Sequence, residues 1–121
     1  MATFARIYVG DDGLSHVEDM EPPFGQSADP EGALEATPFS RATEVAFRRS
    51  PPGHFQDFHT PPRRQYTVTL SGEVEVTPED GRTRRFGPGT VLLVEDLTGK
   101  GHTTRVVGSE VRVFMVVALD D

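Results

Sequence analysis

Chemically active side chains gather in one stretch of the chain, residues 54–76, which reads HFQDFHTPPRRQYTVTLSGEVEV. It holds two histidines and an aspartate, and Asp57 lies two positions before His59. On an unbroken strand, residues two apart point to the same side, so we expect the Asp57 carboxylate beside the His59 imidazole. Imidazole is a common metal ligand, and a neighbouring carboxylate can act as a base. The stretch therefore predicts a chemical site.

From Gln65 onward the same stretch alternates between polar and apolar residues. Gln65, Thr67 and Thr69 would share one face of a strand, and Val68 and Leu70 would lie on the other. A polar row of this kind beside histidines favours a lined cavity over a wholly apolar core.

The rest of the chain must supply the elements that position these groups. Twelve glycines and ten prolines separate many short runs, which favours an all-β sandwich or barrel. We expect strands at residues 4–9, 43–49, 54–60, 65–70, 73–77, 83–86, 91–94, 103–107 and 111–119. The runs 65–70 and 73–77 should form a hairpin around Ser71 and Gly72.

Two segments of the chain are expected to act as a lid, contact a partner or pack against another part of the protein. Residues 14–38 carry little pattern and four prolines, so we expect an extended arm that is either a lid or partner contact, or a loop held by its own apolar residues. His16, within this arm, is expected to have no role. The apolar run 111–119 should be central in a sheet or covered by a second subunit, which predicts a homodimer.

Length and composition limit the possible functions. The 121 residues indicate one domain over 1–121, with an N-terminal strand and arm in 1–40 and a barrel core in 41–121. The chain has no cysteine for disulfides or thiolate metal sites, and its net charge of −7 argues against nucleic-acid binding. No apolar run approaches the ~20 residues of a membrane span, and the N-terminus lacks a signal-peptide pattern. We expect a cytoplasmic protein without membrane contact.

Two segments resemble the motifs of the cupin superfamily and together cover residues 54–106. The first motif reads roughly G-x5-H-x-H-x3,4-E-x6-G; setting its last glycine on Gly72 places its histidines at His59 and Pro61 and its glutamate at Gln65. The second, G-x5-P-x-G-x2-H-x3-N, resembles FGPGTVLLVEDLTGKGHTTRV, with its histidine at His102. The resemblance implies an antiparallel jelly-roll barrel, the double-stranded β-helix of cupins.

The resemblance also implies a metal site. In cupins the corresponding positions point into the barrel and hold a divalent metal, here His59, Gln65 and His102. Two imidazoles and an amide oxygen suit a divalent transition metal such as Zn, Ni, Fe, Cu or Mn. Asp57 would supply the missing anionic ligand or act as catalytic base on a metal-bound water. The alternative is a hydrogen-bonded polar lining without metal.

Two arginines are candidates for substrate binding. Arg63 shares the face of Gln65 by alternation, and Arg105 follows shortly after His102. Either guanidinium could hold a substrate carboxylate in a forked pair at the barrel mouth. The alternative is a solvated surface arginine or one paired with an acidic residue.

Other polar residues near the motifs are assigned no direct chemistry. His54 lies five positions before His59, so an unbroken strand would turn it to the opposite face. Glu95 and Asp96 end an apolar run just before a glycine-containing loop, and a role in the turn is expected.

The expected function is that of a metal-assisted enzyme acting on a small, anionic metabolite by isomerisation, lyase-type elimination or dioxygenation. One competing hypothesis is a non-catalytic cupin that binds a small ligand. Another is an accessory protein with a degenerate metal site, which Pro61 and Gln65 would fit. The fold alone does not choose among them, because one fold hosts many functions.

Overall fold

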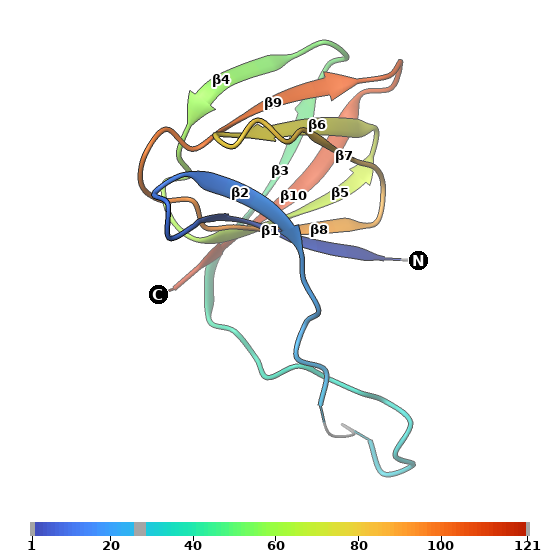
Figure 1. Cartoon of the computed structure of the whole chain (residues 1–121). Helices are drawn as coiled ribbons and strands as arrows, with labels where there is room; N and C mark the ends of the chain where they lie inside the picture. Colours follow the sequence, from blue (N-terminus) through green and yellow to red (C-terminus); the bar gives the residue numbers. More distant parts are fainter. Residues whose placement is uncertain (1, 26–28, 121) are drawn as a thin grey trace.

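The computed structural model describes residues 2–25 and 29–120, and these form ten strands in two facing sheets without any helix (Figure 1). The strands are β1 Thr3–Val9, β2 Ser15–Asp19, β3 Ala42–Ser50, β4 Phe55–His59, β5 Gln65–Ser71, β6 Glu73–Pro78, β7 Arg84–Phe86, β8 Thr90–Val94, β9 His102–Val107 and β10 Arg112–Leu119. No helix in this described part is long and apolar enough to cross a membrane.

One sheet has six strands in the order β2-β1-β8-β5-β10-β3, and the other has four in the order β4-β9-β6-β7. Neighbouring strands run antiparallel except β1 and β8, which are parallel. The predicted all-β jelly roll is confirmed, with this one parallel pair added to it.

The core lies between the two sheets. Its buried residues come from alternate positions on facing strands, as expected when every second side chain points inward. They are Ala5, Ile7, Val74, Val76, Phe86, Leu92 and Val94.

The predicted hairpin around Ser71 and Gly72 is wrong. β5 pairs with β8 and β10 in the larger sheet, whereas β6 pairs with β7 and β9 in the smaller one. Gly72 instead carries the chain from one sheet to the other at φ +74, and a Cβ there would lie 2.7 Å from the Cα of Arg112. Only glycine tolerates both that dihedral and that approach. Alternation identified both strands but could not assign them to different sheets.

The arm expected over residues 14–38 contains a strand. β2 covers Ser15–Asp19 and pairs antiparallel with β1, so the N-terminal hairpin is part of the larger sheet. After β2, residues 20–25 lead away from the barrel, and residues 29–41 lead back to β3 (Figure 1); the part of the expected arm at residues 26–28 lies outside the described residues. The strand was missed because four of its five residues are polar and its only apolar residue is Val17, which leaves no apolar alternation to detect.

The apolar strand β10 is internal, as predicted, because β5 and β3 pair with its two edges. The edge of the larger sheet is β3, which is exposed along almost its whole length. Val45 and Phe47 on this strand have 59% and 69% of their surface exposed. Part of the uncovered apolar surface therefore lies on β3.

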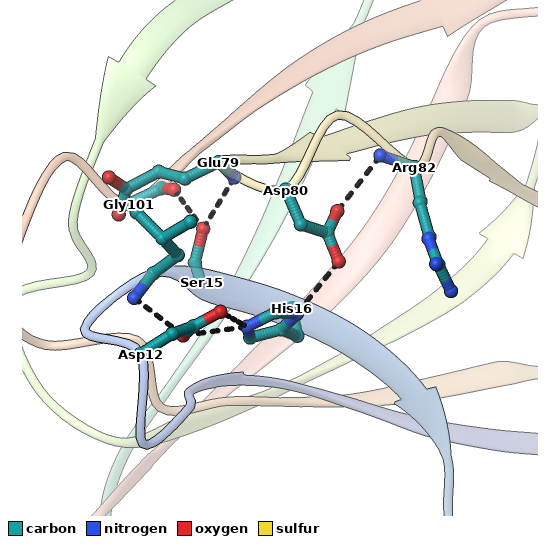
Figure 2. A network of polar contacts seen from close by, with 8 residues as sticks. Asp12, Ser15, His16, Glu79, Asp80, Arg82 and Gly101 are labelled. Atoms are coloured by element: carbon teal, nitrogen blue, oxygen red, sulfur yellow. Dashed lines mark hydrogen bonds and ion pairs between the residues drawn. The ribbon is translucent and has the colours of Figure 1, made fainter.

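His16, to which the sequence assigned no role, fastens the β1–β2 hairpin to the turn after β6 (Figure 2). Its Nδ1 lies 2.8 Å from a carboxylate oxygen of Asp80, and its Nε2 lies 2.9 Å from both carboxylate oxygens of Asp12. Beside it, the buried Ser15 hydroxyl donates to the Gly101 carbonyl at 2.6 Å and accepts from the Glu79 N–H at 2.7 Å. Two neighbouring residues of β2 thus hold three loops together.

Gly101 brings the loop before β9 against the end of β4. It is buried at φ +78, and a Cβ at this position would collide with the carbonyl oxygen of His59. The close approach fixes the backbone on which two of the predicted site residues lie, His59 and His102.

Gly101→Ala should destabilise the protein far more than the control Gly53→Ala. Both glycines have positive φ, 78° and 84°, so alanine at either position costs about 1 kcal/mol for the left-handed backbone. A Cβ at Gly53 meets open space, whereas at Gly101 it meets backbone. Urea denaturation should show an additional loss of roughly 2–3 kcal/mol for Gly101→Ala. Equal losses would contradict the close approach to β4.

A second prediction concerns pH. Hydrogen bonds to Asp12 and Asp80 raise the pKa of His16 above its ordinary value of 6.5, because they favour the imidazolium. Its contribution to stability is therefore complete below about pH 6.5 and is lost as the pH rises through the raised pKa. The same contact lowers the pKa of Asp12, whose contribution is lost only as the pH falls through that lowered value.

The measurement is the unfolding free energy of His16→Gln and of the parent across pH. The substitution should reduce stability more near pH 5.5 than near pH 8.5. His54→Gln is the control, because the His54 side chain is exposed outside this network and should show no such dependence. A difference that grows with rising pH would contradict the ion-paired arrangement.

Candidate functional site

A pocket of about 120 Å³ lies inside the barrel, between the two sheets. Its apolar lining comes from the core strands, including Ile7, Val76 and Leu92. Its polar lining residues are Arg48, Gln56, His59, Gln65, Thr67, His102, Thr104 and Arg112. The predicted lined cavity is therefore present, since polar residues from both sheets line one space between them.

His59 and His102 meet in this pocket. They are directly opposite in the pairing of β4 with β9, and their ring centroids are 4.8 Å apart. His102 is buried and His59 is half-buried, so the pair sits at the inner wall and extends toward the solvent. The structure thus brings together the two histidines that the sequence motifs singled out.

The predicted position of Asp57 beside His59 is wrong. Gln56 pairs with Thr104 and His59 with His102, so β4 uses three steps where β9 uses two, which is a β-bulge. The extra residue interrupts alternation: Gln56 and His59 both line the pocket, while Asp57 is exposed and outside the lining. Its carboxylate accepts from the Phe58 N–H at 2.8 Å. Asp57 is therefore not placed to act as a base on a group in the pocket.

Each histidine is held through its Nδ1. The His102 Nδ1 lies 2.6 Å from a carboxylate oxygen of Asp96, a residue with 0% exposure. The His59 Nδ1 lies 2.7 Å from the Asp57 carbonyl oxygen, which can only accept a hydrogen bond. The proton of a neutral ring is therefore on Nδ1 in both cases, and the lone pair is on Nε2. Two oriented Nε2 lone pairs are electron-pair donors of the kind that a transition metal can use.

Asp96 is the residue of this site that sequence reasoning misassigned. A role in the turn was expected for Glu95 and Asp96, but only Glu95 lies where solvent reaches it, between Arg6 and Arg64 at 3.1 and 2.9 Å. Asp96 instead turns inward to His102. The sequence did contain a signal for this contact. Asp96 lies six residues before the motif histidine, and the glycine-containing loop between them is short enough to bring the end of β8 close to the start of β9.

Gln65 and Pro61 occupy the remaining motif positions, and both line the pocket. Gln65 is the first residue of β5 and pairs with Val94 and Ala118, so its amide lies on the wall of the larger sheet. Within the described residues, no group of three or more His, Cys, Asp or Glu side chains could hold a metal. The donors at the motif positions are therefore two imidazoles and one neutral amide.

Arg63 and Arg105 lie outside the pocket, contrary to the expected placement. The Arg63 guanidinium pairs with Glu44 at 2.9 Å on the surface. Arg105 faces outward because Thr104, its neighbour on β9, faces inward, and its guanidinium stacks over Phe55 at 4.6 Å. Neither guanidinium reaches the pocket in this arrangement.

Two other arginines line the pocket, and the sequence reasoning missed both. Arg48 lies on the exposed edge strand β3, and Arg112 begins β10 with only 6% of its surface exposed. The signal for Arg112 was available, because a charged residue on the inward-facing register of an apolar strand is unusual unless it is paired or functional.

Solved structures with this fold support the architecture. A protein with a double-stranded β-helix domain from Klebsiella pneumoniae is 25% identical at a TM-score of 0.51, over 62% of this chain and 61% of that one. The polyketide cyclase RemF from Streptomyces resistomycificus is 16% identical at a TM-score of 0.51, over 86% and 80%. The cupin domain of Cnp3 from Schizosaccharomyces pombe has the same identity and TM-score, over 99% and 89%. The last two show the fold alone.

The family can also be identified from the sequence. No curated protein matches the chain. Residues 39–113, more than half of the chain, match the model of the EutQ-like cupin domain, and this range contains both motif histidines, Gln65 and Asp96. The strand order, the central pocket and this match agree, and the chain therefore belongs to the family of EutQ-like cupin domains.

Proposed function

We propose that this cupin is an enzyme that acts on a small, anionic molecule in the barrel pocket, with a divalent transition metal held by His59, His102 and Gln65. One observation carries the proposal: both imidazoles are fixed through Nδ1, which leaves the lone pair of each Nε2 available to a metal. Histidines that bind metals nearly always have this outer hydrogen bond, to a carboxylate or a backbone carbonyl. Here His102 has a carboxylate partner and His59 has a backbone carbonyl partner.

Each residue would have a separate role in the site. Asp96 would hold His102 in the ligating tautomer, and the Asp57 carbonyl would do the same for His59. The Gln65 amide would supply a neutral oxygen, and the buried wall of core residues would limit access of water. A bound metal would act as a Lewis acid, polarising a substrate oxygen for isomerisation or elimination or accepting a ligand in dioxygenation.

A second function is favoured by the composition of the pocket wall. Among the described residues that line it, none is Asp or Glu. If both histidines hold a metal, no other Asp, Glu or His among the described lining residues remains to act as a general base, and this favours a site that recognises a molecule without converting it. A non-catalytic, ligand-binding cupin is the alternative proposal, and turnover of a bound metabolite is what would separate the two.

The metal proposal predicts that the two pocket histidines, His59 and His102, are needed for metal binding. His59→Ala and His102→Ala should each abolish measurable zinc or nickel binding while the barrel stays folded. Asp96→Asn should weaken the affinity by about 10- to 100-fold, because it removes the acceptor that orients His102. Metal analysis of protein purified without chelator and calorimetric titration measure these effects.

His54→Ala is the matched control, because His54 lies outside the pocket lining and should keep the parent affinity. Gln65→Glu should act in the opposite direction and tighten metal binding, since a carboxylate adds charge attraction to donor capacity. The metal proposal fails if the parent binds neither metal, or if all three histidine variants behave alike.

We also propose that the protein is a homodimer, with the exposed edge strand β3 as the contact. A long unpaired edge with the apolar side chains of Val45 and Phe47 is a surface that a second copy can cover. Light scattering at micromolar concentration should report about twice the 13.3 kDa chain mass. Phe47→Glu should shift the protein to the monomer, whereas a parent that is already monomeric would refute the proposal.

A further inference from the structure

Arg112 carries a buried charge that the protein does not neutralise. Its residue surface is 6% exposed, and its guanidinium stacks on the Phe114 ring with 3.9 Å between the central carbon and the ring centroid. Its Nη2 donates to the neutral Thr69 hydroxyl at 3.1 Å. The Nε is fully buried without a partner, and no ion pair joins Arg112 to an acid in the described part of the chain.

This arrangement is costly and differs from that of other arginines. Arg6, Arg63 and Arg84 each contact a carboxylate on the surface, in a chain that contains nineteen acidic residues. Burial alone lowers the pKa of Arg112 to about 10, so the group stays protonated at neutral pH and its charge lacks compensation. A buried charge without a partner is strongly unfavourable unless something from outside supplies the counter-charge.

A second polar group in the same pocket is also unpaired. The Thr67 Oγ1 is buried without a hydrogen-bond partner, and this residue is 8% exposed. On β5, Thr67 lies between Gln65, at the histidine end of the pocket, and Thr69, which holds Arg112. Thr67 and Arg112 both line the pocket, so two residues that each have an unsatisfied buried polar atom border the same space.

We propose that Arg112 is the anion-binding residue of this pocket and that it takes the carboxylate of a small aliphatic monocarboxylate, with the Thr67 hydroxyl donating to the same molecule. This deepens the proposed function and rests on it. One buried guanidinium balances one negative charge, and its planar fork matches a carboxylate. The other pocket arginine, Arg48, is exposed, so solvent screens its charge.

Size and lining define the rest of the ligand. A pocket of about 120 Å³ suits a small molecule, since an engineered cavity of roughly 150 Å³ takes up benzene. The walls beside Thr67 are apolar, with Leu92 and Val116 paired to it across the neighbouring strands. A small aliphatic carboxylate fits this pocket, because its hydrocarbon part would contact the apolar walls and its carboxylate would pair with Arg112.

The test compares propionate with propionamide, which has the same shape and no charge, in titrations of the full chain at constant ionic strength without added metal. Propionate should bind and propionamide should not. Arg112→Met should lower propionate affinity by at least about thirtyfold, because it removes a buried charged donor. Thr67→Val should lower it by about tenfold. Arg105→Met, which changes an arginine outside the pocket, should leave it unchanged.

Thermal unfolding without ligand distinguishes recognition from a structural role. If the two buried groups serve a ligand, Thr67→Val and Arg112→Met should unfold at the parent temperature or above it, because each removes an unsatisfied buried group. A lowered unfolding temperature in Thr67→Val with unchanged propionate affinity would overturn the proposal. Should Arg112→Met fail to fold, Arg112→Lys keeps the charge without the fork and should still weaken binding.

Two further outcomes have defined meanings. Equal binding of propionamide, or stronger binding of inorganic phosphate than of propionate, would overturn the monocarboxylate assignment. His102→Ala should lose zinc and keep propionate, while Arg112→Met should keep zinc and lose propionate. Zinc binding by a parent that does not bind propionate would reject this inference and leave the metal proposal standing, and the reverse result would reject the metal proposal alone.

Discussion

The contact between Gly101 and the end of β4 is the constraint on which the site depends. It lets the loop before β9 pass directly against the backbone of His59, and the next residue along that loop is His102. The two histidines become direct neighbours across β4 and β9 only because the backbone comes this close. The Ser15 hydroxyl, which donates to the Gly101 carbonyl, ties the same point to the N-terminal hairpin. A glycine therefore determines the geometry of a site to which it contributes no side chain.

Two buried ionic groups, Arg112 in the pocket wall and Asp96 behind His102, are in opposite situations. Asp96 is wholly buried but has a partner, since His102 donates to it at 2.6 Å. Arg112 is almost as deeply buried and has only a hydroxyl and an aromatic ring as partners. Asp96 fixes the orientation of the His102 ring, whereas the charge of Arg112 has no counter-charge within the described residues. The same physical cost of burial thus supports a positioning role for Asp96 and the proposed recognition role for Arg112.

The fold could be predicted from the sequence, and the site only in part. Alternating runs bounded by glycine and proline identified nine of the strands, since those signals are local, and the motif histidines did meet. Asp57 was misplaced because a bulge in β4 breaks alternation, and sequence periodicity contains no sign of a single extra residue. Asp96 was misassigned and Arg112 was missed although each had a local signal, because those signals become decisive only with burial and with partners from other strands.

The described chain leaves three buried side-chain atoms without hydrogen-bond partners: the Thr67 hydroxyl, one Asp96 oxygen and the Arg112 Nε. Two of these residues line the pocket, and the third holds a histidine that does. Unsatisfied polar groups scattered by imperfect packing would have no reason to gather around one cavity of about 120 Å³. Sequences break local rules of stability mainly where function requires it. The polar atoms left unpaired by folding therefore locate the site as clearly as the histidines do, and they do so without reference to any metal.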